Sequence, residues 1–229
     1  MKVCLTLDAD WAPRDVVAFA LQPLLDAGIP FTYFATDDYA GYPDGATELA
    51  WHPDFRARGL PQELETFSTL IPGARGLRPH GLVMPQTEHL EGLLNVYGIE
   101  WVSASFSPHR TEPEWSPASV LNFPINWGDN LWFRERILPP FERIRRASPG
   151  YFILNVHPIH LFLNTANLDQ YTEAKADYQN VDRLRRHINT SETGVGDIFN
   201  DILKLRDCNA VYFMTLSQAW SDFSGAPLT

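Results

Sequence analysis

Apolar segments that predict strands alternate with amphipathic segments that predict helices along most of this chain of 229 residues. The expected strands are residues 2–8, 31–35, 47–51, 75–78, 100–103, 120–124, 151–157 and 210–215. The expected helices are residues 15–27, 62–70, 87–97, 131–146, 169–188 and 197–206. Strands that alternate with helices usually pair in parallel through right-handed crossovers. The pattern therefore predicts an α/β fold, and seven or eight such units favour a (β/α) barrel over an open sheet.

The length of the chain suits a single α/β barrel domain. Hydrophobic residues make up 45% of the sequence, which is enough for a sizeable core. The sequence contains no internal repeat, low-complexity tract or linker rich in Gly and Ser, so we expect one domain over residues 1–229. Residues 103–130 are dense in Pro, Trp and Ser and predict a long loop that contains one strand.

The formal net charge of −10 disfavours binding to nucleic acid or to an anionic membrane surface, because both need positive charge. The sequence has no secretory signal pattern and no apolar stretch long enough to span a membrane. Cys4 and Cys208 are expected to be free, buried thiols. These features together predict a cytoplasmic protein without membrane insertion, and the alternative is the mature form of a secreted protein whose signal has been removed.

Two acids end the first expected strand. The odd-numbered residues 3, 5 and 7 are apolar and share one face, whereas Asp8 and Asp10 lie on the other face. Carboxylates two residues apart on a strand are about 7 Å apart, so both can reach one water or one metal. Acids at the C-terminal end of a barrel strand are typical of catalytic groups in β/α enzymes. The alternative is an ordinary solvated turn.

Glu48 and His52 are four positions apart, and His52 directly follows the third expected strand. On an extended strand they would be about 13 Å apart, whereas on a helical turn they would be neighbours. Pro53 disfavours helical geometry at His52. The pair can therefore share a metal only if the strand breaks near Glu48, and the alternative is an ordinary strand end.

Histidines also follow two later strands. Arg78 and His80 come after the fourth expected strand, and the alternative for them is a surface loop. The apolar strand at residues 151–157 ends in His157, at the same end of its strand as Asp8. This position favours a functional role for His157, whereas the alternative for His160 is a structural histidine.

Taken in chain order, these strand ends and the residues that follow them resemble the motifs of the NodB-type polysaccharide deacetylases. The first motif is the acidic end of strand one, at residues 5–10, and the second matches His52 followed by Pro53. Glu48 stands where that motif normally has its first His. The third motif is similar to residues 78–80, the fourth to Trp127 and Asp129 in altered order, and the fifth to residues 154–157. Residues 213–217 resemble the final strand of the family.

The resemblance implies a distorted barrel of about seven parallel strands and a metal-dependent deacetylase. Carried over position by position, it implies that Asp10, Glu48 and His52 bind the metal. It implies that Asp8 is the base, that Arg78 orients Asp8, and that His157 is the acid. Among the branches of the family, the chain is most similar to cytoplasmic members of surface-polysaccharide (O-antigen) biosynthesis.

Amide hydrolysis needs an activated water, a stabilised oxyanion and a proton for the leaving amine, and this set of residues can supply them. We expect one divalent metal, zinc on family grounds, although two carboxylates and one imidazole also admit manganese or ferrous iron. The expected substrate is an N-acetylated sugar or glycan precursor. Candidate substrate contacts are His80, Trp127, His160 and Asn164. The alternatives are a non-catalytic barrel that binds a glycan or a protein, and a metal hydrolase of another C–N bond.

Overall fold

The computed structural model describes residues 1–39, 45–85, 87, 89–116, 120–208 and 210–227. Ten strands in this part of the chain form one sheet in the order β6-β7-β5-β4-β3-β2-β1-β9-β8, and β10 pairs with β1. The strands are β1 (Lys2–Asp8), β2 (Phe31–Ala35), β3 (Glu48–Trp51), β4 (Gly76–Leu77), β5 (Trp101–Val102), β6 (Glu114–Trp115), β7 (Leu121–Asn122), β8 (Ile125–Gly128), β9 (Tyr151–Val156) and β10 (Tyr212–Phe213).

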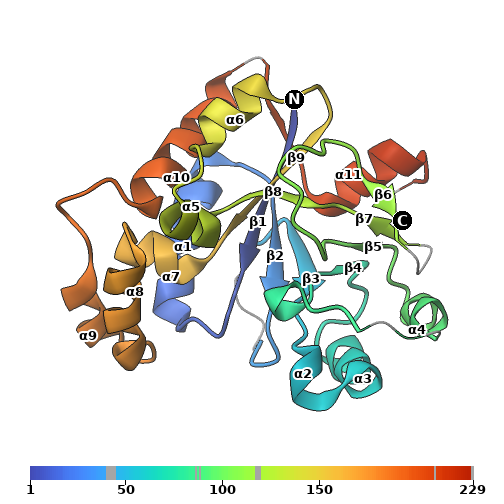
Figure 1. Cartoon of the computed structure of the whole chain (residues 1–229). Helices are drawn as coiled ribbons and strands as arrows, with labels where there is room; N and C mark the ends of the chain where they lie inside the picture. Colours follow the sequence, from blue (N-terminus) through green and yellow to red (C-terminus); the bar gives the residue numbers. More distant parts are fainter. Residues whose placement is uncertain (40–44, 86, 88, 117–119, 209, 228–229) are drawn as a thin grey trace.

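The sheet is mostly parallel and curls into a distorted barrel (Figure 1). Every pair of neighbouring strands is parallel except β6 and β7. Strand β1 lies between β2 and β9, where Leu5 pairs with Phe31 of β2 and with Leu154 of β9. A parallel bridge between Phe106 and Ile125 joins the segment after β5 to β8, so that opposite ends of the sheet meet. The expected fold class is confirmed.

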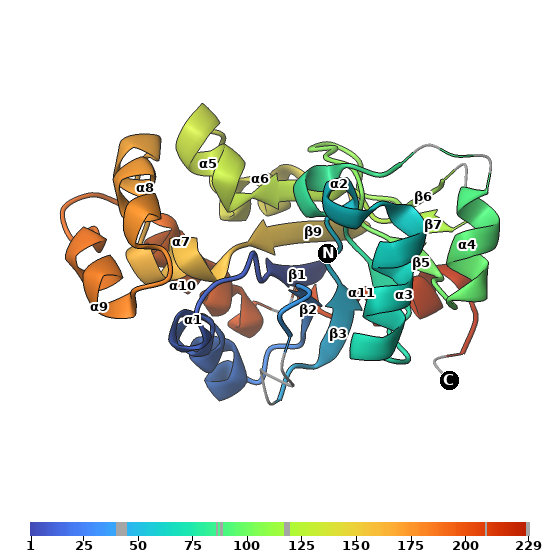
Figure 2. The ribbon, with the colours of Figure 1, turned by 90° about the horizontal axis from the view of Figure 1, so that it is seen from below.

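Helices cover the outside of the sheet, and α8 and α9 form a further layer beyond α1 and α7 (Figures 1 and 2). The α-helices are α1 (Arg14–Ala27), α2 (Phe55–Arg58), α3 (Leu60–Leu70), α4 (Leu90–Val96), α5 (Asp129–Glu135), α6 (Pro140–Arg146), α7 (Pro158–Leu163), α8 (Leu168–Ala174), α9 (Val181–Leu184), α10 (Val195–Lys204) and α11 (Leu216–Ser224). Short 3₁₀ turns are η1 (His80–Leu82), η2 (Lys175–Asp177), η3 (Arg185–His187) and η4 (Leu205–Asp207).

The alternation of side chains along β1 determines which residues reach the inside of the barrel. Leu5 and Leu7 belong to the larger core, which packs between the sheet and the helices. Cys4 belongs to a separate core that fills the barrel, together with Phe34 and Trp101. Because side chains alternate along a strand, Asp8 has the same inward direction as Cys4 and lies at the C-terminal mouth of the barrel.

Several details differ from the sequence-based expectations. Residues 131–146 form two helices, because Arg136 is in the left-handed conformation (φ 51°), and the second helix begins at Pro140 after Pro139. Residues 169–188 form α8, η2, α9 and η3 rather than one helix. Among the described residues of 103–130 there are three strands, β6, β7 and β8, where the sequence predicts one. Cys4 is buried, but Cys208 is exposed, which corrects the expectation of two buried thiols.

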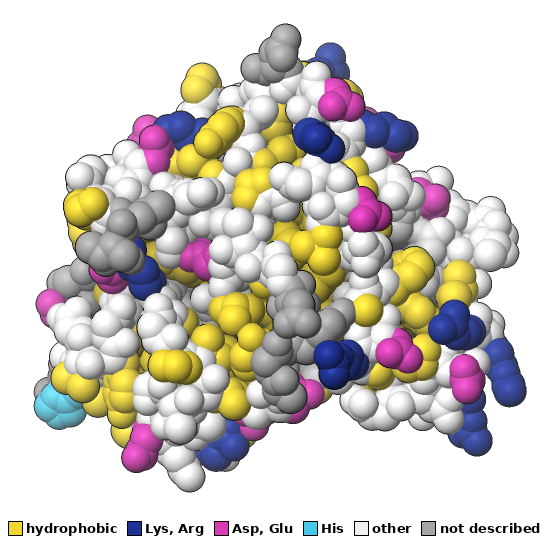
Figure 3. Space-filling model, turned by 180° about the vertical axis from the view of Figure 1, so that it is seen from behind, with side chains coloured by type: hydrophobic (Ala, Val, Ile, Leu, Met, Phe, Trp, Pro, Cys, Tyr) yellow, Lys and Arg dark blue, Asp and Glu magenta, His cyan; other side chains and the backbone are white. Residues whose placement is uncertain are grey.

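Across the described residues, every helix is too short or too polar to cross a bilayer. On the face opposite to that of Figure 1, Lys and Arg side chains are interspersed with Asp and Glu, without a single broad basic patch (Figure 3).

Candidate active site

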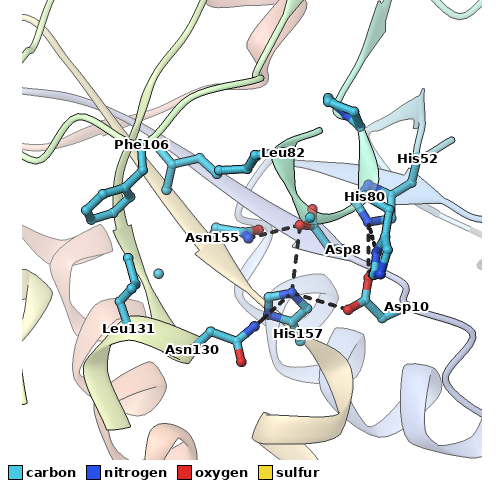
Figure 4. Close-up of a pocket in the computed structure, with 14 residues that line it drawn as sticks. Asp8, Asp10, His52, His80, Leu82, Phe106, Asn130, Leu131, Asn155 and His157 are labelled. Atoms are coloured by element: carbon cyan, nitrogen blue, oxygen red, sulfur yellow. Dashed lines mark hydrogen bonds and ion pairs between the residues drawn. The ribbon is translucent and has the colours of Figure 1, made fainter. Parts of the chain in front are cut away.

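Polar side chains from several strands meet around a cavity of about 380 Å³ at the C-terminal mouth of the barrel. Asp8 ends β1, His52 follows β3, and His157 follows β9. Parallel strands bring their C-terminal ends to the same edge, which is why residues so distant in sequence line one cavity. The expected residues Asp8, Asp10, His52, His80 and His157 all line it (Figure 4).

Asp10, His52 and His80 form a compact cluster on one side of the cavity. Oδ1 of Asp10 lies 3.0 Å from Nε2 of His52 and 3.1 Å from Nδ1 of His80. The two imidazole nitrogens lie 3.2 Å from each other. His52 is buried, whereas Asp10 and His80 are each about one quarter exposed toward the cavity. The three ligand atoms therefore converge on one point that solvent can reach.

The cluster fits a divalent metal. Ligands about 2.0–2.1 Å from a zinc ion in tetrahedral geometry lie roughly 3.3 Å from one another, which is close to the observed separations. Nδ1 of His52 lies 2.8 Å from the carbonyl oxygen of Arg78. If Nδ1–H donates there, the lone pair of Nε2 faces Asp10 and His80, as is usual for histidine ligands of metals.

Glu48 does not belong to this cluster, which corrects the expected ligand set. Glu48 is the first residue of β3 and His52 follows the last, so the unbroken strand holds them about 13 Å apart. The carboxylate of Glu48 accepts hydrogen bonds from Thr32 Oγ1 at 2.5 Å and from Ser217 N at 3.1 Å. Burial raises the pKa of Glu48, although these hydrogen bonds oppose the effect. His80, expected only as a substrate contact, takes the place of Glu48.

Asp8 is held by a buried network rather than by the cluster. Its Oδ1 accepts a hydrogen bond from Arg78 at 2.7 Å, and its Oδ2 accepts one from Asn155 at 2.9 Å. The same guanidinium also donates to Thr6 and Ser103, which fixes its plane. Burial alone would raise the pKa of Asp8, but the positive charge of Arg78 outweighs it with the help of nearby histidines, and the pKa is lowered. Asp8 is therefore ionised and oriented.

His157 lies between Asp8, the last residue of β1, and Asp10, in the turn that follows, with Nε2 3.8 Å from Asp8 Oδ2 and 3.6 Å from Asp10 Oδ2. Its Nδ1 lies 2.7 Å from Oδ1 of the fully buried Asp129. Burial would lower the pKa of His157, but the charges of Asp129, Asp10 and Asp8 together raise it to about 10. His157 therefore carries a proton at neutral pH and presents it to the cavity.

Three expected substrate contacts lie elsewhere. Trp127 is fully buried in the core, and its indole donates to the carbonyl of Leu138. His160 is buried behind His157, 3.1 Å from Asn130 Oδ1, and it does not line the cavity. Asn164 ends α7, where its side chain accepts from the backbone of Gly196. These residues shape the scaffold around the cavity, and the three expectations are corrected.

The far side of the cavity is apolar. Leu82, Phe106 and Leu131 lie opposite the Asp10 cluster, with Asp8 and His157 between the two sides (Figure 4). Ile125 completes this wall, and the amide of Asn130 lies at its border with His157. A ligand with one polar, reactive group and a small apolar group therefore fits the two sides.

The fold and this site define a deacetylase-like barrel, and the comparisons with known proteins agree. A profile of the WbmS-like family, described as polysaccharide deacetylases, matches residues 5–175. Because the match covers more than half of the chain, the protein belongs to the WbmS-like polysaccharide deacetylase family. No curated protein matches the chain.

Solved structures show the same fold at low sequence identity. A proposed polysaccharide deacetylase of O-antigen biosynthesis from Bordetella bronchiseptica is 23% identical over 89% of this chain and 90% of its own, with a TM-score of 0.72. A proposed polysaccharide deacetylase from Mycobacterium smegmatis is 17% identical over 100% and 92% (TM-score 0.60). A family 4 acetyl xylan esterase from Clostridium thermocellum, solved with a cobalt ion, is 12% identical over 99% and 93% (TM-score 0.51).

Some site residues had little signal in the sequence. Asn155 shares a strand face with His157, and Ser103 and Asn130 match none of the resembled motifs. Asp129 was aligned with the fourth motif, but its contact with His157 was not foreseen. Each of these residues lies at or just beyond the end of a strand whose C-terminus faces the cavity. Position at a strand end was therefore the usable signal.

Proposed function

We propose that this protein is a metal-dependent hydrolase that removes an N-acetyl group from a sugar or glycan precursor. The observation that carries the proposal is the convergence of Asp10, His52 and His80 on one point, beside a cavity that also holds Asp8 and His157. The family match supports a carbohydrate amide as the substrate class.

Asp10, His52 and His80 would hold the metal. When bound, the metal would polarise the amide carbonyl and lower the pKa of a water molecule in the cavity. One carboxylate and two imidazoles form a set that zinc commonly takes, and zinc remains our assignment over manganese or iron. The correction from Glu48 to His80 strengthens this choice, because imidazole is a softer ligand than carboxylate.

Asp8 serves as the general base in this proposal. Its lowered pKa keeps it ionised, and Arg78 and Asn155 hold its two oxygens at the edge of the cavity. It can accept a proton from the attacking water as the new C–O bond forms. The hydrogen bond from Arg78 also fixes the carboxylate of Asp8 in a position separate from the proposed metal ligands.

His157 serves as the general acid. Its proton is on Nε2, which faces Asp8 and Asp10, while Nδ1 is engaged by Asp129. When the C–N bond breaks, Nε2–H can deliver its proton to the departing nitrogen. The apolar wall of Leu82, Phe106 and Leu131 suits the methyl of an acetyl group.

The description of the Bordetella bronchiseptica structure suggests a precursor of a surface polysaccharide as the substrate. To test the proposal, acetate release from N-acetylated sugars and nucleotide-linked N-acetyl sugars is measured together with metal content after purification without chelator. The wild type is expected to bind one equivalent of zinc and to release acetate. His80→Ala should lose both properties, and Glu48→Gln should keep both.

Metal binding without release of acetate from any N-acetylated carbohydrate would contradict the proposed reaction and favour a different C–N bond. Absence of both would favour a barrel that only binds a glycan or a protein. Equal metal loss in His80→Ala and Glu48→Gln would contradict the ligand assignment.

A further inference from the structure

The turn that carries Asp10 has an unusual backbone. Asp10 and Trp11 are consecutive non-glycine residues with positive φ angles, 45° and 55°. Side chains disfavour this left-handed region, and a bulky residue such as Trp is rarely found there. Such a conformation persists only when its surroundings impose it. The question is which residues hold the turn.

Two side chains from a distant part of the chain bind the turn's carbonyl groups. Tyr178 Oη donates to the carbonyl oxygen of Asp10 at 2.8 Å, and Gln179 Nε2 donates to that of Trp11 at 3.0 Å. Both donors lie between η2 and α9, in the outer helical layer visible in Figure 2. They also lie beyond residues 5–175, the part of the chain that the family profile matches.

The other side of the turn is held through the indole of Trp11. Its Nε1–H donates to Asp37 Oδ1 at 2.7 Å, and Arg58 binds the second oxygen of Asp37 at 2.7 Å. The Trp11 ring also packs edge-on against His80, with 5.0 Å between ring centroids. The turn is therefore held on two sides and contacts the cluster through both Asp10 and Trp11.

We propose that Tyr178, assisted by Gln179, is a positioning residue that holds the Asp10–Trp11 turn in its left-handed conformation and so aims the Asp10 carboxylate at His52 and His80. This inference rests on the proposed function for its metal. It adds that metal affinity depends on a hydroxyl that touches neither the metal nor the cavity. Without that hydroxyl, the turn can relax toward an ordinary backbone, and Asp10 moves out of line with the two imidazoles.

The first test measures zinc affinity by competition with a chromogenic chelator. Tyr178→Phe is expected to weaken binding about tenfold, the lower end of the range for groups that orient metal ligands. The matched control is Tyr171→Phe, which removes a hydroxyl from the neighbouring helix α8. Among the described residues, that hydroxyl makes no hydrogen bond, so the control should match the wild type. Equal affinities for all three proteins, or equal losses in both variants, would overturn the proposal.

The second test needs no metal. Hydrogen–deuterium exchange of the apoprotein is followed in peptides covering residues 8–13, where the Ala12 amide donates to Ala9 O at 2.9 Å. Exchange there should quicken in Tyr178→Phe and stay unchanged in Tyr171→Phe. Because this result is independent of zinc, it separates failure of the positioning role from failure of the metal assignment.

Gln179→Ala covers the case in which Tyr178→Phe does not fold. The side chain of Gln179 is exposed, so its removal should leave the core intact. A two- to threefold weakening of zinc binding and faster exchange at residues 8–13 are expected, about the effect of one lost hydrogen bond. Wild-type affinity and wild-type exchange in this variant would contradict the role of the segment.

Discussion

Asp129 binds His157 twice. Its Oδ1 lies 2.7 Å from Nδ1 of the imidazole, and its Oδ2 accepts the backbone N–H of the same residue at 2.6 Å. One carboxylate thus fixes both the backbone and the ring of His157, which leaves Nε2 facing Asp8 and Asp10. The backbone N–H of Asn130 also donates to Oδ1 of Asp129.

We predict that Asp129→Asn lowers kcat by about 10²–10⁴, because the ring of His157 loses both its orientation and the charge that keeps it protonated. Zinc content should not change, since Asp129 contacts none of the three ligands. Steady-state kinetics and metal analysis check this, and Asp197→Asn, distant from the cavity, is the control. A wild-type kcat in folded Asp129→Asn would remove the acid role from His157.

We predict that Asp8→Asn abolishes turnover and keeps the metal, whereas His52→Ala loses the metal. The amide oxygen of Asn can still accept the hydrogen bond from Arg78, but the side chain cannot accept a proton from water. His52 supplies one of three converging atoms, and its loss leaves an open site. Metal analysis of both purified variants distinguishes the roles, and the same metal loss in each would show that Asp8 is itself a ligand.

We predict that Arg78→Met destabilises the fold by about 3–5 kcal/mol, the usual effect of leaving one member of a buried ion pair without its partner. Asp8 would then hold an uncompensated charge in a buried position. Adding Asp8→Asn to Arg78→Met should recover part of this loss, because the unpaired charge is removed. Urea unfolding of the single and double variants measures the coupling, and strictly additive effects would mean that the two side chains stabilise the fold independently.

We predict that Glu48 makes stability depend on pH. Burial raises its pKa in the folded protein above the ordinary value of 4.5, so the folded state holds this proton more tightly than the unfolded state. The stability from Glu48 is therefore complete below the unfolded pKa and falls as pH rises through the folded pKa.

The Glu48→Gln variant cannot lose this proton, so its unfolding free energy relative to the wild type should rise as pH increases from about 4 to 8. Urea unfolding across that range measures the difference. Metal content should stay at the wild-type level throughout. A pH-independent difference between the two proteins would mean that Glu48 has an ordinary pKa in the folded state.

The fold was predictable because local pattern determines it. The apolar segments at residues 2–8 and 31–35 predicted strands β1 and β2 with the observed limits. Short strands such as β4 and β5 were placed within one or two residues, because each lies between a helix and a polar segment. The break at Arg136 was not predicted. A left-handed backbone at a residue other than glycine does not change the amphipathic pattern of the sequence.

The sequence predicted only those site residues that lie at the end of a clearly predicted strand. Asp8, His52 and His157 each follow a clear strand, and all three line the cavity. Glu48 was expected from its spacing to His52 and from its place in the resembled motif, but neither says at which end of a strand a residue lies. His80 was underrated for the opposite reason, since it becomes a ligand candidate only when β3 and β4 are known to be neighbours.

The position of β1 between β2 and β9 affects how the chain can be synthesised and folded. Its partner β2 follows closely in the sequence. Its other two partners come only after residue 150: β9 lies along its other side, and β10 pairs with its first residues. During translation, β1 therefore has one open edge until most of the chain has left the ribosome. Such an edge can pair with other chains. Low temperature and slow expression should increase the soluble yield, and fragments that end before β9 should aggregate.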